Sequence, residues 1–276
     1  MSLIESAFLK SRQKLDDFDE AEPNLYLERA NVSERVTGEV ANKNEFGVND
    51  SRKHINNMRQ SDGFSRNDFA RLGIVHPNMK DTSLLHKYRN LRTKLFASTN
   101  RNFATLVTSV VSYPEAGAVA SNLAAVIAMD EGKTSLLIDA NVESPSLAKQ
   151  FGCDYSNGLV DYLGSNDLTC SEILCESKIP RVRIIPTGNV NVNAAEYLAS
   201  SKMNSLFGEL KNRYPERYPI VASASINHSA ETRTLMDLCD RVILVVPYGK
   251  CLMDEIRYAV SAIGKEKLLG VVLDEF

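Results

Sequence analysis

The sequence lacks the features that would place it in a membrane, outside the cell or on nucleic acid. No run approaches the roughly 18 apolar residues that a membrane span requires, and no signal peptide opens the chain. The formal net charge is −3 and the pI is about 5.9, which gives no electrostatic basis for binding nucleic acid. We therefore expect a cytoplasmic protein without a transmembrane segment.

The five cysteines lack the spacing of a metal site. Cys170 and Cys175 lie near each other in sequence, but no His or further Cys accompanies them at the spacing of metal ligands. The cysteines are also odd in number and widely spaced. We expect free thiols rather than a disulfide or a metal site.

What the chain does contain predicts three segments. Residues 1–15 place Leu3, Ile4, Ala7 and Phe8 on one side of a helix, which either docks on its own chain or binds a partner or a membrane surface. Residues 16–80 are rich in Asp, Glu, Asn, Ser and Arg without a lasting period, which predicts a linker or weakly ordered arm. Residues 81–276 have the pattern of a packed domain.

In this third segment, apolar strand-like runs alternate with helical patterns. The expected strands are 104–111, 135–138, 182–186, 219–224, 241–246 and 268–273, and the expected helices are 82–96, 117–129, 144–151, 194–213, 231–238 and 253–263. Such alternation predicts an α/β fold, a mostly parallel sheet with helices on both faces. Sheets of this kind bind ligands at the carboxyl ends of their strands.

One strand–turn–helix junction, residues 105–124, lies at that edge. Junctions of this kind hold phosphate on backbone N–H groups, and their working form is G-x-x-x-x-G-K-[ST]. Here the frame is present, but Tyr113, Ala116 and Gly117 stand where Gly, Lys and Ser/Thr are expected.

Acidic residues are scarce at the neighbouring strand ends. Asp139 follows the strand at 135–138. A carboxylate there has two possible roles. It is either catalytic, as a base or as the group that orients a metal-bound water, or structural, as the cap of a turn or helix. The strand near 219–224 carries no acid.

The chain from about residue 68 onward resembles the bacterial tyrosine kinases of exopolysaccharide synthesis, which belong with the MinD and ParA ATPases to a deviant P-loop class. The family pattern T-S-x-x-P-G-E-G-K-S-T-x-x-x-N-L-A falls on residues 108–124 without a gap, and L-L-I-D-x-D-x-R-x-P falls on residues 136–145. Residues 157–163, 186–188 and 195–203 also match family motifs, and the opening twelve residues resemble kinases of exosortase-associated polysaccharide clusters. The resemblance implies a P-loop NTPase-like domain.

The residues that depart from these motifs are those that would bind phosphate and metal. The degenerate loop is made of Ser112, Tyr113, Pro114, Glu115, Ala116 and Gly117, and the former acid positions hold Asp139, Asn141 and Ala222. Pro114 also removes one backbone donor. We expect no catalytic residue, no metal and no cofactor.

A further family motif, E-x-x-R-x-x-R, mediates assembly and falls on the helix at 82–96. Its positions hold His86, Arg89 and Arg92, so both arginines remain and the acid is replaced. The two arginines either form a solvated basic face or, as the resemblance implies, an interface with the acids of an active kinase paralogue.

The resemblance implies a role in exopolysaccharide or capsule polymerisation and export, and the lost chemical groups imply a catalytically inactive adaptor that regulates it. Its expected partners are a membrane chain-length regulator (a polysaccharide co-polymerase) and an active kinase paralogue, which would hold it at the inner membrane. Two alternatives remain open at this point. One is an autokinase with a rebuilt ATP/Mg site and Asp139 as base, and the other is a nucleotide sensor that does not hydrolyse.

Overall fold

The computed structural model describes Ile55 and residues 63–98, 102–153 and 155–275. The expected helix at 1–15 and most of the expected arm lie outside these residues. The described part forms one compact unit. Its elements are, in chain order, α3 (Arg66–Leu72), α4 (Ser83–Ala97), β1 (Thr105–Ser109), α5 (Ala116–Ala128), β2 (Thr134–Asp139), α6 (Leu147–Phe151), α7 (Leu159–Gly164), the 3₁₀ turn η1 (Cys170–Ile173), β3 (Cys175–Glu176), β4 (Val182–Ile185), α8 (Ala194–Leu198), α9 (Ser201–Arg213), β5 (Arg217–Ala222), α10 (Ala230–Leu238), β6 (Arg241–Pro247), α11 (Met253–Ile263) and β7 (Leu268–Asp274).

Seven strands form one sheet in the order β3-β4-β2-β5-β1-β6-β7. All neighbouring pairs are parallel except β3–β4, which is antiparallel. β1 lies in the interior between β5 and β6 and is buried along its whole length. The predicted α/β architecture is confirmed.

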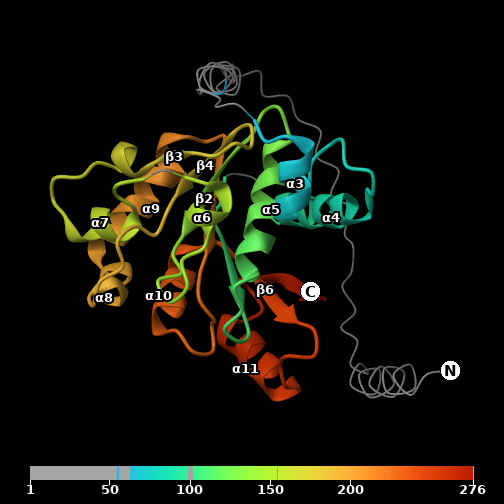
Figure 1. Cartoon of the computed structure of the whole chain (residues 1–276). Coiled ribbons are helices and arrows are strands. Elements are labelled where there is room, and N and C mark those ends of the chain that lie inside the picture. Colours follow the sequence, from blue (N-terminus) through green and yellow to red (C-terminus); the bar gives the residue numbers. More distant parts are fainter. Residues whose placement is uncertain (1–54, 56–62, 99–101, 154, 276) are drawn as a thin grey trace, which may run out of the picture. The chain divides into compact units, whose positions relative to one another are not determined.

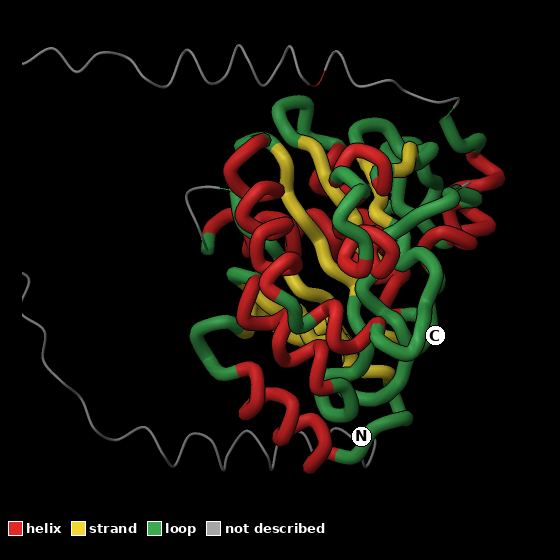
Figure 2. The backbone as a smooth tube through the Cα atoms, turned by 90° about the vertical axis from the view of Figure 1, so that its left-hand side faces the viewer, coloured by secondary structure: helices red, strands yellow, loops and turns green. Residues whose placement is uncertain are grey.

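The sheet separates two apolar cores, and helices cover both of its faces (Figures 1 and 2). Strand residues alternate between the two cores because successive side chains point to opposite faces. One face packs on α4 and α5 through Val107, Leu137, Ile184, Ile220 and Ile243, and the other packs on α7 to α11 through Leu106, Leu136, Ile185, Val221 and Val242. Helix α5 is almost entirely buried, which explains its run of small apolar residues.

The packed part begins before residue 81, where the sequence places its start. Helix α3 has a capping box at Ser65 and ends at Gly73, whose φ of 62° is the left-handed conformation that glycine favours. Ile74 and Val75 are buried in the core. The side chain of Asn122 on α5 accepts from the N–H of Val75 at 2.7 Å and donates to the carbonyl of Gly73 at 3.0 Å. These two hydrogen bonds hold the turn after α3 against α5. The described residues of 63–80 therefore belong to the domain.

Two other details differ from the sequence-based expectations. The single helix expected at 194–213 is two helices, because Ser200 adopts an extended conformation and caps α9 by accepting from the N–H of Met203. The short helix α7 and strand β3 were not expected. Among the described residues, no helix has the length and hydropathy of a bilayer span.

Candidate functional site

The loop between β1 and α5 lies at the carboxyl edge of the sheet, as expected for a phosphate-binding junction. Three of its backbone donors are already used within the turn that starts α5. The N–H groups of residues 116, 117 and 118 donate to carbonyls three residues earlier, at 3.1, 3.2 and 2.9 Å respectively. These bonds form a tight helical turn, and N–H groups that complete such a turn do not point outward at an anion. Within this turn, Ser112, Pro114 and Glu115 are exposed, whereas Ala116 and Gly117 are buried.

The space beside Gly117 is filled by the loop that follows β2. A Cβ atom on residue 117 would lie 3.2 Å from Ser146 Oγ and 3.4 Å from Leu147 Cδ2. A serine or threonine at this position would therefore meet those two side chains. The close approach of the two loops depends on the absence of a side chain at Gly117.

Asp139 is 1% exposed, and its carboxylate is bound by backbone donors. It accepts from the N–H groups of Ser146 at 3.0 Å, Leu147 at 2.9 Å and Asn141 at 3.3 Å. Burial raises the pKa of the Asp139 carboxyl, while these three N–H groups act in the opposite direction. The geometry is that of a side chain that closes a turn at the start of α6.

Hydroxyl groups, not acids, hold the neighbouring strand ends together. Thr108 Oγ1 donates to the carbonyl of Ala224 at 2.6 Å, and Thr232 Oγ1 donates to the same carbonyl at 3.2 Å. Ser225 Oγ donates to the carbonyl of Val110 at 2.8 Å. Ala222 lies in this buried layer. Among the described residues, no group of three or more His, Cys, Asp or Glu side chains could hold a metal ion.

Asn141, at the second former acid position, also has a local role. Its side-chain oxygen accepts from the N–H of Ser144 at 3.1 Å. The amide therefore closes a turn within the loop that packs against Gly117.

Tyr113 joins the core on the α4/α5 face, where it is 6% exposed. The Lys250 ammonium lies 4.9 Å from the centre of its ring. The Tyr113 hydroxyl is buried and makes no hydrogen bond of ordinary geometry. Burial, followed by the nearby carboxylate of Asp274, raises the pKa of Tyr113 to about 12. Tyr113, Lys250 and Asp274 therefore form a cluster. The one feature of the sequence that points to it is the single acid at the end of the apolar strand β7.

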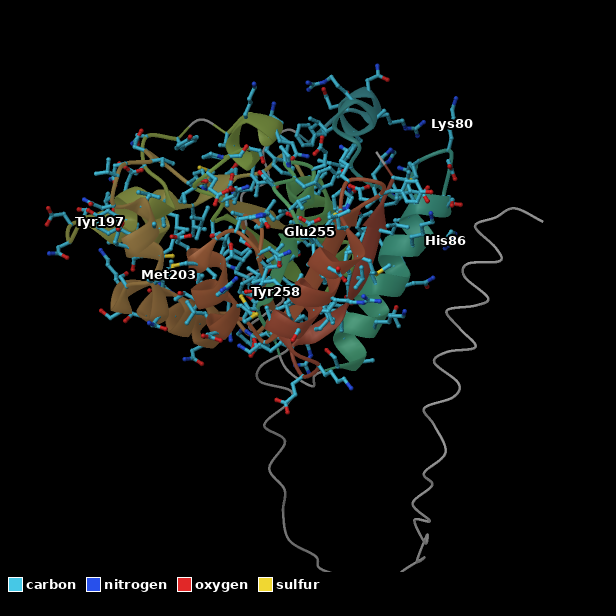
Figure 3. All side chains as sticks on the ribbon, turned by 90° about the horizontal axis from the view of Figure 1, so that it is seen from below. Lys80, His86, Tyr197, Met203, Glu255 and Tyr258 are labelled. Carbon is cyan, nitrogen blue, oxygen red and sulfur yellow. The ribbon has the colours of Figure 1, made fainter. Side chains whose placement is uncertain are left out.

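The two arginines of the assembly motif both lie on α4, but their surroundings differ. Arg92 is half-buried and donates to the carbonyl of Val126 at 2.8 Å, near the end of α5. This cation stabilises the negative end of the α5 dipole within the chain itself. Arg89 is also half-buried, and His86, which replaces the motif's acid, is exposed on the same helix (Figure 3).

A second set of motif residues has a structural explanation that sequence reasoning missed. Asp161 on α7 accepts from the N–H groups of Gly158 at 2.8 Å and Asn189 at 3.0 Å. The backbones of Gly158 and Gly188 are in close contact, and Gly188 has a φ of 86°. The two motifs at 157–163 and 186–188 therefore form one turn-to-turn contact beyond the end of β4.

Comparison with known proteins identifies the proteins to which this chain is similar. No family model matches the chain. It is 28% identical over 211 residues to "Tyrosine-protein kinase CpsD" of Streptococcus agalactiae serotype III, covering 75% of this chain and 89% of CpsD. The chain is thus a relative of the bacterial tyrosine kinases. Another relative, the "Succinoglycan biosynthesis transport protein ExoP" of Rhizobium meliloti, is 24% identical over 75% of this chain but only 27% of ExoP.

Solved structures share the fold of this chain. The "chimerical protein CapA2B2" aligns with a TM-score of 0.67 at 22% identity, covering 83% of this chain and 99% of that one. The kinase domain of Escherichia coli tyrosine kinase ETK aligns with a TM-score of 0.67 at 21% identity, covering 79% and 82%. The resemblance drawn from the motifs is confirmed, and the P-loop NTPase-like fold with it.

Proposed function

We propose that this relative of the tyrosine kinases does not transfer phosphate and instead acts as an adaptor in exopolysaccharide or capsule synthesis. One observation supports the absence of phosphate transfer. The N–H groups of residues 116–118, at the start of α5, donate to carbonyls of the same turn, and the loop after β2 fills the space beside Gly117. The chain thus keeps the sequence pattern of its relatives around a junction that is closed.

The side chains at this junction do not fit ATP and Mg²⁺. The lysine position holds the buried apolar Ala116, and the hydroxyl position holds Gly117. Glu115, at the N-cap of α5, places a negative charge where a phosphate would lie. Phosphate-clamping cations and metals typically contribute factors of about 10³ or more to the rate of phosphoryl transfer. Their joint loss leaves no group to supply that stabilisation.

Asp139 does not restore the chemistry. A general base needs an oxygen within hydrogen-bond reach of the proton that it removes. The Asp139 carboxylate is turned into the closed loop and accepts from three backbone N–H groups. This arrangement supports the turn-closing role over that of a base in an autokinase.

The biological setting of the proposal rests on the relatives. CpsD is named a tyrosine-protein kinase, and ExoP is named a succinoglycan biosynthesis transport protein. We infer a cytoplasmic adaptor at the inner membrane that binds a membrane chain-length regulator. An active kinase paralogue is the second partner, and Arg89 is the better candidate for that contact because Arg92 is already bonded within the chain.

The absence of catalysis is tested with labelled ATP and Mg²⁺, together with calorimetric titration of ATP and of ADP. We expect no incorporated label and no heat of binding, because the N–H groups of residues 116–118 and the space beside Gly117 are taken. Asp139→Asn is the matched variant, since it keeps an acceptor for the turn while removing a base. Label that the wild-type chain incorporates and this variant does not would make the protein an autokinase. Heat of binding without label would make it a nucleotide sensor.

The adaptor role is tested by co-purification of the full chain with the membrane chain-length regulator encoded in the same cells. We expect the regulator to be retained on the tagged chain, and the active kinase to be retained less well by Arg89→Ala than by wild type. Arg89→Lys, which keeps the charge but not the forked geometry, is the control for a bidentate contact. A chain that retains neither protein would refute the adaptor role.

A further inference from the structure

The sheet divides the cysteines of the chain into two sets. Cys153 and Cys175 pack against the core on the α4/α5 face. The other three belong to the core on the opposite face, namely Cys170, Cys239 and Cys251. The structure describes all of these residues, and among them Cys153 and Cys175 are the one pair on the α4/α5 face.

The backbone holds both residues of this pair in place. Helix α6 ends at Gly152 with a φ of 60°, and the N–H of Cys153 donates to the carbonyl of Ala148 at 2.9 Å. This bond belongs to the glycine-based motif that commonly ends helices. Cys175, the first residue of β3, lies opposite Ile184 of β4 in the antiparallel pair. Each thiol therefore extends from a backbone that its own element fixes.

The two thiols are in contact. The Cys153 thiol donates a hydrogen bond to the Cys175 side chain. Cys153 Sγ also lies 3.9 Å from the carbonyl oxygen of Glu176, the residue after Cys175. Both cysteines are half-buried, so a small oxidant can reach them. Sulfurs in such contact come within the length of a disulfide bond, about 2.0 Å, by rotation of the two side chains.

The pair lies where the first described residues of the domain pack on it. The N–H of Phe64 donates to the carbonyl of Lys178, just after β3, at 3.2 Å. The ring of Phe64 lies 6.2 Å from that of Phe151, the last residue of α6, between centres. Residue 64 therefore rests on both elements that carry the pair. β3 has only two residues, so its strand pairing alone holds it weakly.

We propose that Cys153 and Cys175 form a reversible disulfide when the protein meets hydrogen peroxide, and that this bond fixes the end of α6 to β3. The hydrogen bond to Cys175, followed by burial, raises the pKa of the Cys153 thiol, so Cys153 keeps its proton and Cys175 reacts first.

The two steps of the oxidation balance. The Cys175 thiolate attacks one peroxide oxygen, the O–O bond breaks, and the hydroxide that leaves takes up the proton that Cys175 released, which gives one water and a sulfenic acid. The Cys153 sulfur then attacks the sulfenic sulfur, the S–O bond breaks, and the second hydroxide leaves as water with the Cys153 proton. Two electrons pass from the two sulfurs to the peroxide.

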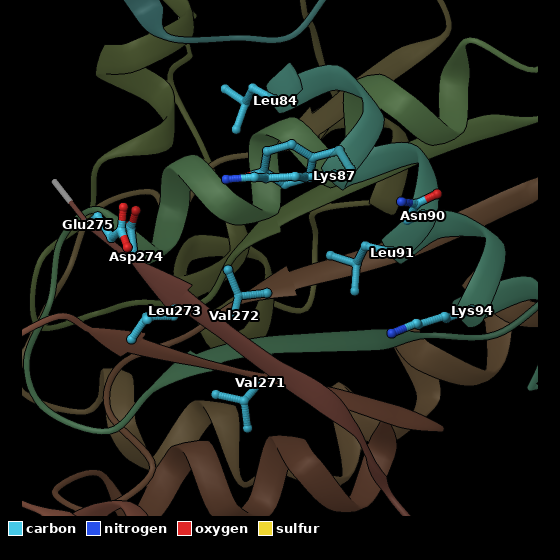
Figure 4. Close-up of a pocket in the computed structure, with 11 residues that line it drawn as sticks. Leu84, Lys87, Asn90, Leu91, Lys94, Val271, Val272, Leu273, Asp274 and Glu275 are labelled. Carbon is cyan, nitrogen blue, oxygen red and sulfur yellow. The ribbon is translucent and has the colours of Figure 1, made fainter. Parts of the chain in front are cut away.

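The location of the pair separates it from the other sites of the chain. A groove of about 710 Å³ lies between α4 and β7, at the opposite edge of the sheet from β3, and no cysteine lines it (Figure 4). Neither cysteine belongs to the loop from Ser112 to Gly117, so the inference is independent of the proposed function. Disulfides that form in reducing compartments are usually transient and redox-sensing, which agrees with a reversible bond.

The test is to treat the reduced full chain with hydrogen peroxide, block the remaining thiols with N-ethylmaleimide and map the peptides by mass spectrometry. We expect a cross-link between the peptides of Cys153 and Cys175, with the loss of two hydrogen atoms and reversal by dithiothreitol. The other three cysteines should be alkylated. Cys153→Ser should abolish the cross-link, whereas Cys170→Ser, the matched control on the opposite face, should keep it.

Thermal unfolding measures what the bond does to the fold. We expect the midpoint of the oxidised wild type to lie about 5 °C above that of the reduced protein, because the bond closes the loop between residues 153 and 175 in the unfolded chain. Cys153→Ser and Cys175→Ser, treated with peroxide in the same way, should show no rise. A cross-link through another cysteine would overturn the proposal, as would sulfinic or sulfonic acid without a cross-link. Thiols that peroxide leaves unchanged, or a cross-link that does not raise the midpoint, would overturn it too.

Discussion

Gly158→Ala is expected to destabilise the fold by about 3 kcal/mol or more, because a Cβ atom there meets backbone and not side chain. That atom would lie 2.4 Å from the nitrogen of Gly188 and 2.5 Å from the carbonyl oxygen of Pro186. Neither atom belongs to a side chain that can rotate away. The contact must open, and with it the bonds from the N–H groups of Gly158 and Asn189 to Asp161.

The chain supplies its own control for this substitution. Gly208 lies within α9, and a Cβ atom there meets nothing within 4 Å. Gly208→Ala is therefore expected to stabilise the protein by roughly 0.5–1 kcal/mol, because alanine loses less backbone entropy than glycine in a helix. Urea denaturation of the two variants measures both changes. If Gly158→Ala stayed within 1 kcal/mol of wild type, the turn-to-turn contact would not have the tightness described.

The fold followed from the sequence because the strands are near-continuous apolar runs. Helix α11 and the start of β7 lie where periodicity placed them, and β2 and β6 differ only at their ends. The break between α8 and α9 could not be predicted in this way. It depends on Ser200 leaving the helical conformation to cap α9, although the apolar period continues across it.

The packing of residues 63–80 was missed for a different reason. Their apolar residues are too few to set a lasting helical or strand period. They are held by a contact across 47 residues, from Asn122 to Val75. Hydrogen bonds of that range depend on the arrangement of whole elements, which no local pattern encodes.

The candidate site was predictable in its residues but not in its conformation. The motif positions place the loop from Ser112 to Gly117 and Asp139 after neighbouring strand ends, and in the structure Ser146 and Leu147 lie beside both Gly117 and Asp139. Whether the N–H groups point outward or close a turn depends on backbone angles that the residue types leave open. The same holds for Asp139, for which a catalytic and a turn-closing role were both compatible with the sequence.

Tyr113→Gly is expected to destabilise the protein by about 3 kcal/mol, because it removes a large buried ring from the core beside α5. The variant also loses the contact between the ring and the Lys250 ammonium, and glycine adds entropy to the unfolded chain. Thermal and urea denaturation measure the change. Unaltered stability would mean that the ring fills no essential space.

Tyr113→Phe separates the ring from its hydroxyl, and we expect it to be close to neutral at pH 7 or slightly stabilising. The hydroxyl is buried and makes no hydrogen bond of ordinary geometry, so its removal costs no such bond, and the Asp274 carboxylate loses only a close neighbour. The two proteins should diverge only in alkali. The pKa of Tyr113 rises from 10.0 to about 12 on folding, so the unfolded chain loses this proton first, and the wild type loses stability as the pH rises from 10 to 12. Tyr88, whose pKa burial also raises, is present in both proteins and cancels in the comparison. Parallel stability curves for wild type and Tyr113→Phe over this range would show that the Tyr113 hydroxyl is not buried in the folded protein.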